Sequence, residues 1–166
     1  MSTDLLVIPG PGVIARRGEA VLWAESSDLR RESLLASLVT AMADLATGRR
    51  SPADFAAWLI AELGGPRGAT VPALAFAHPD GGELLTVVQG WGRVTAPGGV
   101  VTVTGTPIRI PAALPVAVGR ADLAVLASGD SLLSLAEGTV PGGAALILPP
   151  QPGAADSVPA ATSSTP

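Results

Sequence analysis

The sequence lacks several residue types entirely and has very little of another. Its 166 residues include no cysteine, no lysine and no tyrosine, and only one histidine. Without cysteine the chain has no disulfide framework, no zinc–thiolate site and no thiol redox chemistry. Without lysine it has no Walker phosphate loop, which requires a lysine after its second glycine. A histidine-based triad or metal cluster would depend on His78 alone.

Charge and the length of the apolar runs exclude two further classes. The chain carries 10 basic and 14 acidic residues, a formal net charge of −4, and its arginines are scattered. A nucleic-acid-binding surface needs a basic face, so we expect no nucleic-acid partner. No apolar run approaches the roughly 20 residues that span a bilayer, and the N-terminus does not resemble a signal peptide. We therefore expect no transmembrane segment and a cytoplasmic location.

Length and composition predict one domain followed by a tail. Because 48% of the residues are hydrophobic, a chain of this length can bury a core without disulfides or metals. After Pro149 the sequence becomes QPGAADSVPAATSSTP, which is rich in proline, serine, threonine and alanine. We expect a single globular domain over residues 1–150 and a disordered linker or tail over residues 151–166.

Two helices are predicted between an early pair of strands and a long β-rich region. Leu35, Leu38, Met42 and Leu45 follow helical spacing; we expect this helix to open at Ser26-Ser27-Asp28 and to end at Gly48. The second helix has Ser51 as its cap, Pro52 at its first position and Asp54 completing a capping box. Its buried side would comprise Phe55, Trp58, Leu59 and Leu63, and Gly64-Gly65-Pro66 would end it.

The remaining pattern is that of short antiparallel strands. Residues 5–8 and 20–24 read as an early antiparallel pair, and the region from Val71 reads as five to seven strands. Pro79-Asp80-Gly81-Gly82 and Pro97-Gly98-Gly99 are predicted hairpin turns, and 130–136 is a candidate helical turn. The predicted class is α+β: mainly antiparallel sheet packed with a two-helix hairpin, similar to an α/β sandwich.

No residue pattern in the chain predicts a catalytic, cofactor-binding or metal site. His78 lies at the predicted tip of a hairpin, where a solvated turn residue is the expected role. Oxygen ligands for a hard cation would have to converge in space, and the spacing of the acidic residues singles none of them out. The acidic residues considered are Glu19, Glu25, Asp122, Asp130 and Glu137.

The motif Gly90-Trp91-Gly92 raises a different question, because a strand pattern rather than a helix follows it. This context excludes a dinucleotide-binding loop. Most large aromatic side chains of a small domain lie in the core, which we expect for Trp23 and Trp58. Trp91 is the candidate exception, because it sits between two glycines near a strand end. Trp91 and Arg93 are therefore the candidate partner-contact residues.

One resemblance covers roughly residues 5–150. The order of strands around PGPGV, two helices, LLTVVQGWGRVT and finally LAEGTVPGGAALILPP resembles the N-terminal module of actinobacterial proteins that carry a forkhead-associated domain after a proline-rich linker. The arginine-rich, lysine-free composition is typical of such GC-rich genomes. The resemblance implies an adaptor, in which a phosphothreonine-binding domain would lie downstream.

A second, weaker resemblance is to metal-dependent protein phosphatases. GWGRVTAPGG followed by ADLAVLASGDSL is similar to a hairpin motif and a late strand of that family. Trp91 stands where the family has an aspartate, Gly129-Asp130 reverses the family's Asp-Gly order, and the early Asp-Gly motif is missing. Since metal ligands are absent from these positions, the resemblance implies at most a catalytically silent relative.

These observations favour a non-catalytic protein-interaction or scaffolding module, the N-terminal part of a larger adaptor with a protein partner of unknown identity. Two alternatives stay open: a degenerate, phosphatase-like pseudoenzyme, and a regulatory domain that binds a small ligand.

Overall fold

The computed structural model describes residues 4–96, 99–101, 104–112, 115–120 and 133–148. Its helices are α1 (Leu34–Ala46), α2 (Pro52–Leu63) and the short 3₁₀ helix η1 (Gly68–Thr70). Its strands are β1 (Asp4–Ile8), β2 (Val13–Arg17), β3 (Ala20–Glu25), β4 (Ala73–Asp80), β5 (Glu83–Gln89), β6 (Gly92–Ala96), β7 (Gly99–Val101), β8 (Ile108–Pro111), β9 (Val116–Arg120), β10 (Leu133–Ser134), β11 (Gly138–Pro141) and β12 (Ala144–Leu148).

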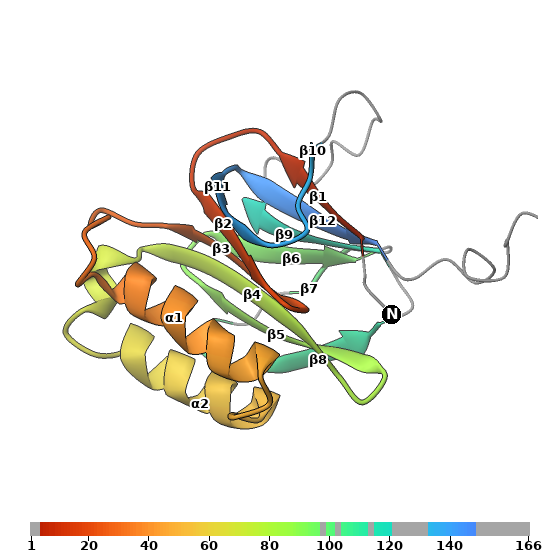
Figure 1. Ribbon diagram of the computed structural model, residues 1–166, viewed down its shortest axis with the longest axis horizontal. Helices are drawn as coiled ribbons and strands as arrows, with labels where there is room; N and C mark the ends of the chain where they lie inside the picture. Colours follow the sequence, from red (N-terminus) through yellow and green to blue (C-terminus); the bar gives the residue numbers. More distant parts are fainter. Residues whose placement is uncertain (1–3, 97–98, 102–103, 113–114, 121–132, 149–166) are drawn as a thin grey trace, which may run out of the picture.

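The described strands form two six-stranded antiparallel sheets that pack face to face. One sheet has the order β11-β2-β3-β4-β5-β8. Because α1 and α2 lie against the face that is turned away from the other sheet, we call it the helix-covered sheet (Figure 1). The other, which we call the outer sheet, has the order β10-β1-β12-β9-β6-β7. This arrangement confirms the predicted α+β class, mainly antiparallel sheet with a helical hairpin.

Helix α1 begins later than the sequence predicted. Its cap is Ser33, whose hydroxyl accepts a hydrogen bond from the Ala36 N–H at 3.1 Å. The predicted start at residues 26–28 is wrong, because the Ser26 hydroxyl instead donates to the Thr70 carbonyl and ties this loop to η1. The predicted apolar face is confirmed, since Leu35, Leu38, Met42 and Leu45 are all buried.

Helix α2 matches its sequence signals closely. The Ser51 hydroxyl accepts from the Asp54 N–H at 3.1 Å, Pro52 occupies the first turn, and Gly64 follows the last residue. Phe55 packs against the ring of Phe76 with centroids 4.8 Å apart. Trp58 is only partly buried, and the Arg50 guanidinium lies 5.0 Å from its ring centroid. Helix ends with such complete local signals are recognisable without tertiary information.

Two hydrophobic layers hold the fold together. The first lies between the helices and the helix-covered sheet and includes Leu38, Phe55 and Phe76. The second lies between the two sheets and includes Trp23 and Val94. Alternate residues of β4 contribute to different layers, because successive side chains of a strand point to opposite faces. The helix-covered sheet is therefore buried on both sides over most of its area.

The predicted pairing of residues 5–8 with residues 20–24 is wrong. β1 lies in the outer sheet between β10 and β12, whereas β3 lies in the helix-covered sheet between β2 and β4. The intervening segment 9–12 crosses from one sheet to the other instead of turning a hairpin. The strand Val13–Arg17 was not predicted, because its paired arginines resemble a turn flank more than a strand.

Other local predictions have mixed outcomes. The β4–β5 hairpin is confirmed, but its loop is Gly81-Gly82 alone, with φ of 63° and 87°. Residues 133–134 form β10 rather than part of a helical turn, and 130–132 lie outside the described residues. Gly99 opens β7, which pairs with β6 as expected, whereas 97–98 lie outside the described residues. The predicted tail, 151–166, also lies outside them.

Two leucines offer a test of the packing. Leu38 is fully buried, whereas Leu29 is 72% exposed. Leu38→Ala is expected to lower the free energy of unfolding by about 2–5 kcal/mol, because it leaves a cavity in the helix–sheet layer. Leu29→Ala is expected to change it by less than about 0.5 kcal/mol. Urea denaturation measures both, and equal losses would contradict the assignment of the core.

Candidate functional site

The turn Gly90-Trp91-Gly92 carries the chain from β5 in the helix-covered sheet to β6 in the outer sheet. Gly90 adopts φ of 58°, in the left-handed region. A Cβ atom at Gly90 would collide with the carbonyl of Pro72, and one at Gly92 would collide with the carbonyl of Leu74. The turn therefore lies directly against the backbone at the start of β4, and there is no room for the Trp91 side chain on that side.

Trp91 is accordingly displayed outward, with 44% of its surface exposed. Arg93 stabilises the conformation of the turn, because its Nη1 donates to the carbonyls of Gly90 at 3.0 Å and Gly92 at 2.8 Å. The two candidate contact residues thus come together, but in different roles. Trp91 is the surface group, and Arg93 is a partly buried group that braces the turn.

An ion pair between the two sheets lies close to this turn. Arg120, at the end of β9, is opposite Gly92 in the β6–β9 ladder, and its guanidinium lies 3.3 Å from the Glu25 carboxylate at the end of β3. Glu25 is thus engaged in a structural contact. Because one partner belongs to each sheet, the pair fixes the sheets relative to each other next to Trp91.

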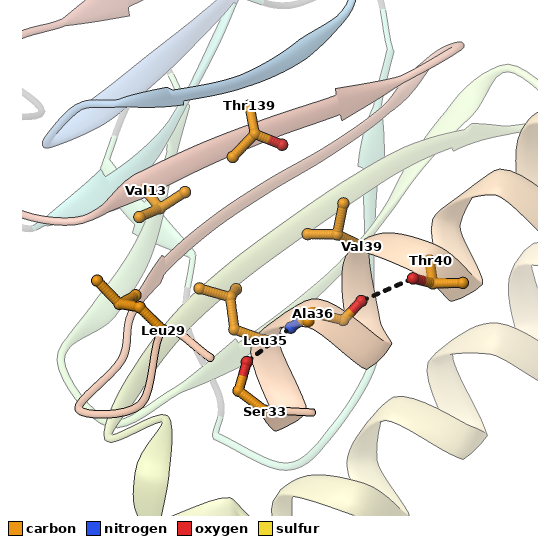
Figure 2. Close-up of a pocket in the computed structure, with 8 residues that line it drawn as sticks. All are labelled: Val13, Leu29, Ser33, Leu35, Ala36, Val39, Thr40 and Thr139. Atoms are coloured by element: carbon orange, nitrogen blue, oxygen red, sulfur yellow. Dashed lines mark hydrogen bonds between the residues drawn. The ribbon is translucent and has the colours of Figure 1, made fainter. Parts of the chain in front are cut away.

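A groove beside α1 was not predicted from the sequence. Figure 2 shows it between α1 and the neighbouring strands β2 and β11, with a volume of about 380 Å³. None of its lining residues is charged. They are Val13, Leu29, Ser33, Leu35, Ala36, Val39, Thr40 and Thr139. These residues are distant in sequence, so only the lone apolar Leu29 between charged neighbours could have signalled an exposed patch.

A second cavity, of about 410 Å³, lies between the start of α2 and the β5–β8 side of the same sheet. Arg109 lines it and forms a 2.6 Å ion pair with Asp80. The Glu83 carboxylate lies 3.9 Å from the same guanidinium nitrogen. With two carboxylates already beside it, Arg109 serves the β4–β5–β8 corner rather than an open site.

The single histidine does not lie where the sequence placed it. His78 is part of β4, opposite Leu85 of β5, and is half-buried instead of occupying a solvated hairpin tip. Its Nδ1 atom is buried without a hydrogen-bond partner among the described residues. Burial lowers the pKa of His78, although the backbone of Pro79 and the carboxylates of Glu19 and Asp80 act in the opposite direction. A neutral imidazole is therefore favoured in the fold.

The acidic residues considered as metal ligands are not brought together in the described part of the chain, which contains no group of three or more potential ligands. Glu137 instead accepts from the Gly18 N–H at 2.9 Å and lies 3.9 Å from Arg17. Asp122 and Asp130 lie outside the described residues. Across the described ranges, no helix is long and apolar enough to cross a membrane.

The geometry of the turn can be tested with a matched pair of glycines. Gly90 and Gly81 have similar φ values of 58° and 63°, but a Cβ atom at Gly81 would meet nothing within 4 Å. Both alanine substitutions incur the strain of the left-handed conformation, and Gly90→Ala adds a collision with Pro72. Gly90→Ala is expected to be the more destabilising by about 1–3 kcal/mol. Chemical denaturation measures this difference, and equal effects would argue against the close packing of the turn.

His78 gives a prediction for pH dependence. Its pKa in the folded protein lies below the ordinary value of about 6.5, so the unfolded chain binds a proton more readily. The contribution of His78 to the free energy of unfolding is therefore fully present above pH 6.5, and it is lost as the pH drops towards the lowered pKa. His78→Asn should lose less unfolding free energy than the wild type between pH 7.5 and pH 5.5 in urea titrations. An identical loss in both proteins would exclude this linkage.

Comparison with known proteins adds no relative from which a role could be transferred. No family model matches the chain, and neither a curated protein nor a solved structure matches it. The functional argument therefore depends on the geometry of the chain itself.

Proposed function

We propose that this domain is a non-catalytic protein-interaction or scaffolding module that contacts its partner through Trp91. The observation that carries the proposal is the outward display of a tryptophan on a turn fixed by two close backbone contacts and by Arg93. Tryptophan is enriched among the residues that dominate binding energy at protein interfaces. A contact group that is already held in place loses little conformational freedom on binding.

The non-catalytic part of the proposal is supported by the roles that polar side chains already have. Glu25 pairs with Arg120, Glu137 pairs with the β2–β3 turn, and Arg109 pairs with Asp80. A catalytic centre needs a nucleophile, a base and an orienting group held around one position. The contacts of these side chains instead stabilise strand ends and corners.

The resemblance to the N-terminal modules of forkhead-associated proteins supports a wider proposal. According to this wider proposal, the domain is the N-terminal part of a larger cytoplasmic adaptor, and a phosphothreonine-binding domain follows residues 151–166. The module would then recruit one protein while the downstream domain recognises a phosphorylated one. The sequence of the full-length gene product would test this arrangement directly.

The role of Trp91 can be measured with a partner captured by the wild-type domain from an extract of its source organism and then purified. Trp91→Ala is expected to raise the dissociation constant about thirtyfold, the equivalent of about 2 kcal/mol at an interface hot spot. Trp91→Phe, which retains a flat apolar group, is expected to lose less affinity for the partner. Isothermal titration calorimetry provides the affinities.

Arg49→Ala serves as the control for this measurement, because Arg49 is exposed in the connection between α1 and α2. Its affinity is expected to equal that of the wild type, and thermal melting would show that all variants are folded. If folded Trp91→Ala binds the partner as tightly as the wild type does, the turn is not the contact surface.

A further inference from the structure

We infer that the free edge of β11 and the groove beside α1 form a second interface, which takes an extended, uncharged peptide segment as an added strand. This surface is separate from the Trp91 turn: it is built from α1, β2 and β11, and none of its residues belongs to that turn. The inference therefore does not depend on the role proposed for Trp91.

The first observation is the direction of the backbone groups in β11. This strand is the last of the helix-covered sheet and, among the described strands, pairs with β2 alone. The Gly142 N–H donates to the Gly12 carbonyl at 3.1 Å, so the backbone of Gly142 faces β2. Because backbone direction alternates along an antiparallel strand, the N–H and C=O of Thr139 point away from β2. Thr139 thus offers one donor and one acceptor to an added strand.

The second observation is that the groove opens on the same face as the Thr139 side chain. Thr139 lines the groove, whereas its neighbour Val140 packs into the layer between the sheets. Directly opposite residues of paired strands place their side chains on the same face. A peptide residue paired with Thr139 would therefore direct its side chain towards Val39 and Leu35 of α1 (Figure 2).

Charge complementarity decides the kind of peptide. The opposite edge of this sheet, β8, carries Arg109 in ion pairs with Asp80 and Glu83, which is the usual protection of an edge against further pairing. β11 (Gly138–Pro141) has no charged residue, and none lines the groove. An uncharged segment with apolar side chains at alternate positions is the occupant that matches both features, and strand addition is an established mode of peptide binding.

The exposed Leu29 extends this surface. It is 72% exposed at the rim of the groove, where isolated hydration of a large apolar side chain is unfavourable. The groove volume of about 380 Å³ falls within the range of about 300–1,000 Å³ that is typical of binding pockets. Apolar side chains of the added strand would thus contact both α1 and Leu29.

The probe for this inference is a displayed library of ten-residue peptides with valine, isoleucine, leucine or phenylalanine at alternate positions and serine, threonine, asparagine or glutamine between them. Enriched peptides are synthesised with a fluorophore, and their affinity for the full chain is measured by fluorescence anisotropy. Thr139→Pro removes the outward N–H without removing a hydrogen bond to β2, and is expected to weaken binding by about three- to tenfold. Thr139→Val keeps that N–H and replaces the hydroxyl with a methyl group, so it should bind at least as tightly as the wild type.

The groove is tested by a matched pair of substitutions in α1. Ala36 lines the groove in the first helical turn, where a carboxylate is compatible with the helix dipole, so Ala36→Asp should fold. It is expected to weaken peptide binding by at least about tenfold, because it places a charge in an uncharged groove. Ala43→Asp introduces the same group at an exposed position of α1 outside the groove and is expected to leave binding within about twofold.

Three outcomes would overturn the inference. The first is the absence of any enriched peptide. The second is a set of peptides that bind Thr139→Pro as well as the wild type but not Ala36→Asp, which would indicate a helix or isolated side chain as the occupant. The third is a wild-type dimer in sedimentation analysis that Thr139→Pro dissociates, which would make a second copy of the chain the occupant. Loss of binding in both test variants, with the Ala43→Asp control intact, supports strand addition.

Discussion

The hydrogen bonds of the Trp23 indole hold together two of the places where the chain passes from one sheet to the other. Trp23 is fully buried, and its Nε1–H donates to the carbonyls of Pro11 at 3.3 Å and Gly142 at 3.1 Å. Pro11 belongs to the crossing from β1 to β2, and Gly142 to the crossing from β11 to β12. Leaving a buried donor unpaired costs roughly 1–3 kcal/mol. The core therefore specifies the path of both crossings, which also determines where β11 ends.

The same packing constraint operates at the crossing from β5 to β6. At the crossing from β1 to β2, a Cβ atom on Gly12 would lie 2.5 Å from Trp23 Nε1. At the crossing from β5 to β6, Gly90 and Gly92 lie against the backbone of β4. In each case a residue without a side chain lets the backbone pass close to a neighbouring strand. The difference is the position of the tryptophan: Trp23 fills the space between the sheets, whereas Trp91 lies within the crossing itself and is directed outward.

The parts of the fold that could be predicted from the sequence are those with local causes. Ser51, Pro52 and Gly64 define α2 through contacts within a few residues, and the helical spacing of Leu38 and Met42 marks one buried face of α1. Strand pairing is non-local, so residues 5–8 and 20–24 looked like partners although the first pairs with β12, near the other end of the described chain. The position of His78 was wrong because the turn needed only Gly81 and Gly82.

The candidate sites were predictable to a similar degree. Two flanking glycines distinguished Trp91 from the core tryptophans, but the bracing role of Arg93 depends on how the turn folds back over its guanidinium group, which has no local sequence signal. The groove could not be predicted from the sequence, because residues of β2, the loop before α1, α1 itself and β11 line it together.

The geometry of β11 also explains how an edge without charged residues can be selective. The strand has only four residues, and Pro141 has no N–H, so Thr139 supplies the one outward donor of the pair. Two backbone hydrogen bonds, each worth about 0.5–1.5 kcal/mol net, give little affinity by themselves. Burial of apolar side chains against Leu35, Val39 and Leu29 has to supply the rest, at roughly 25 cal/mol per Å². An edge built in this way discriminates against strands whose side chains do not alternate correctly, because a shift of one residue turns the apolar groups away from the groove.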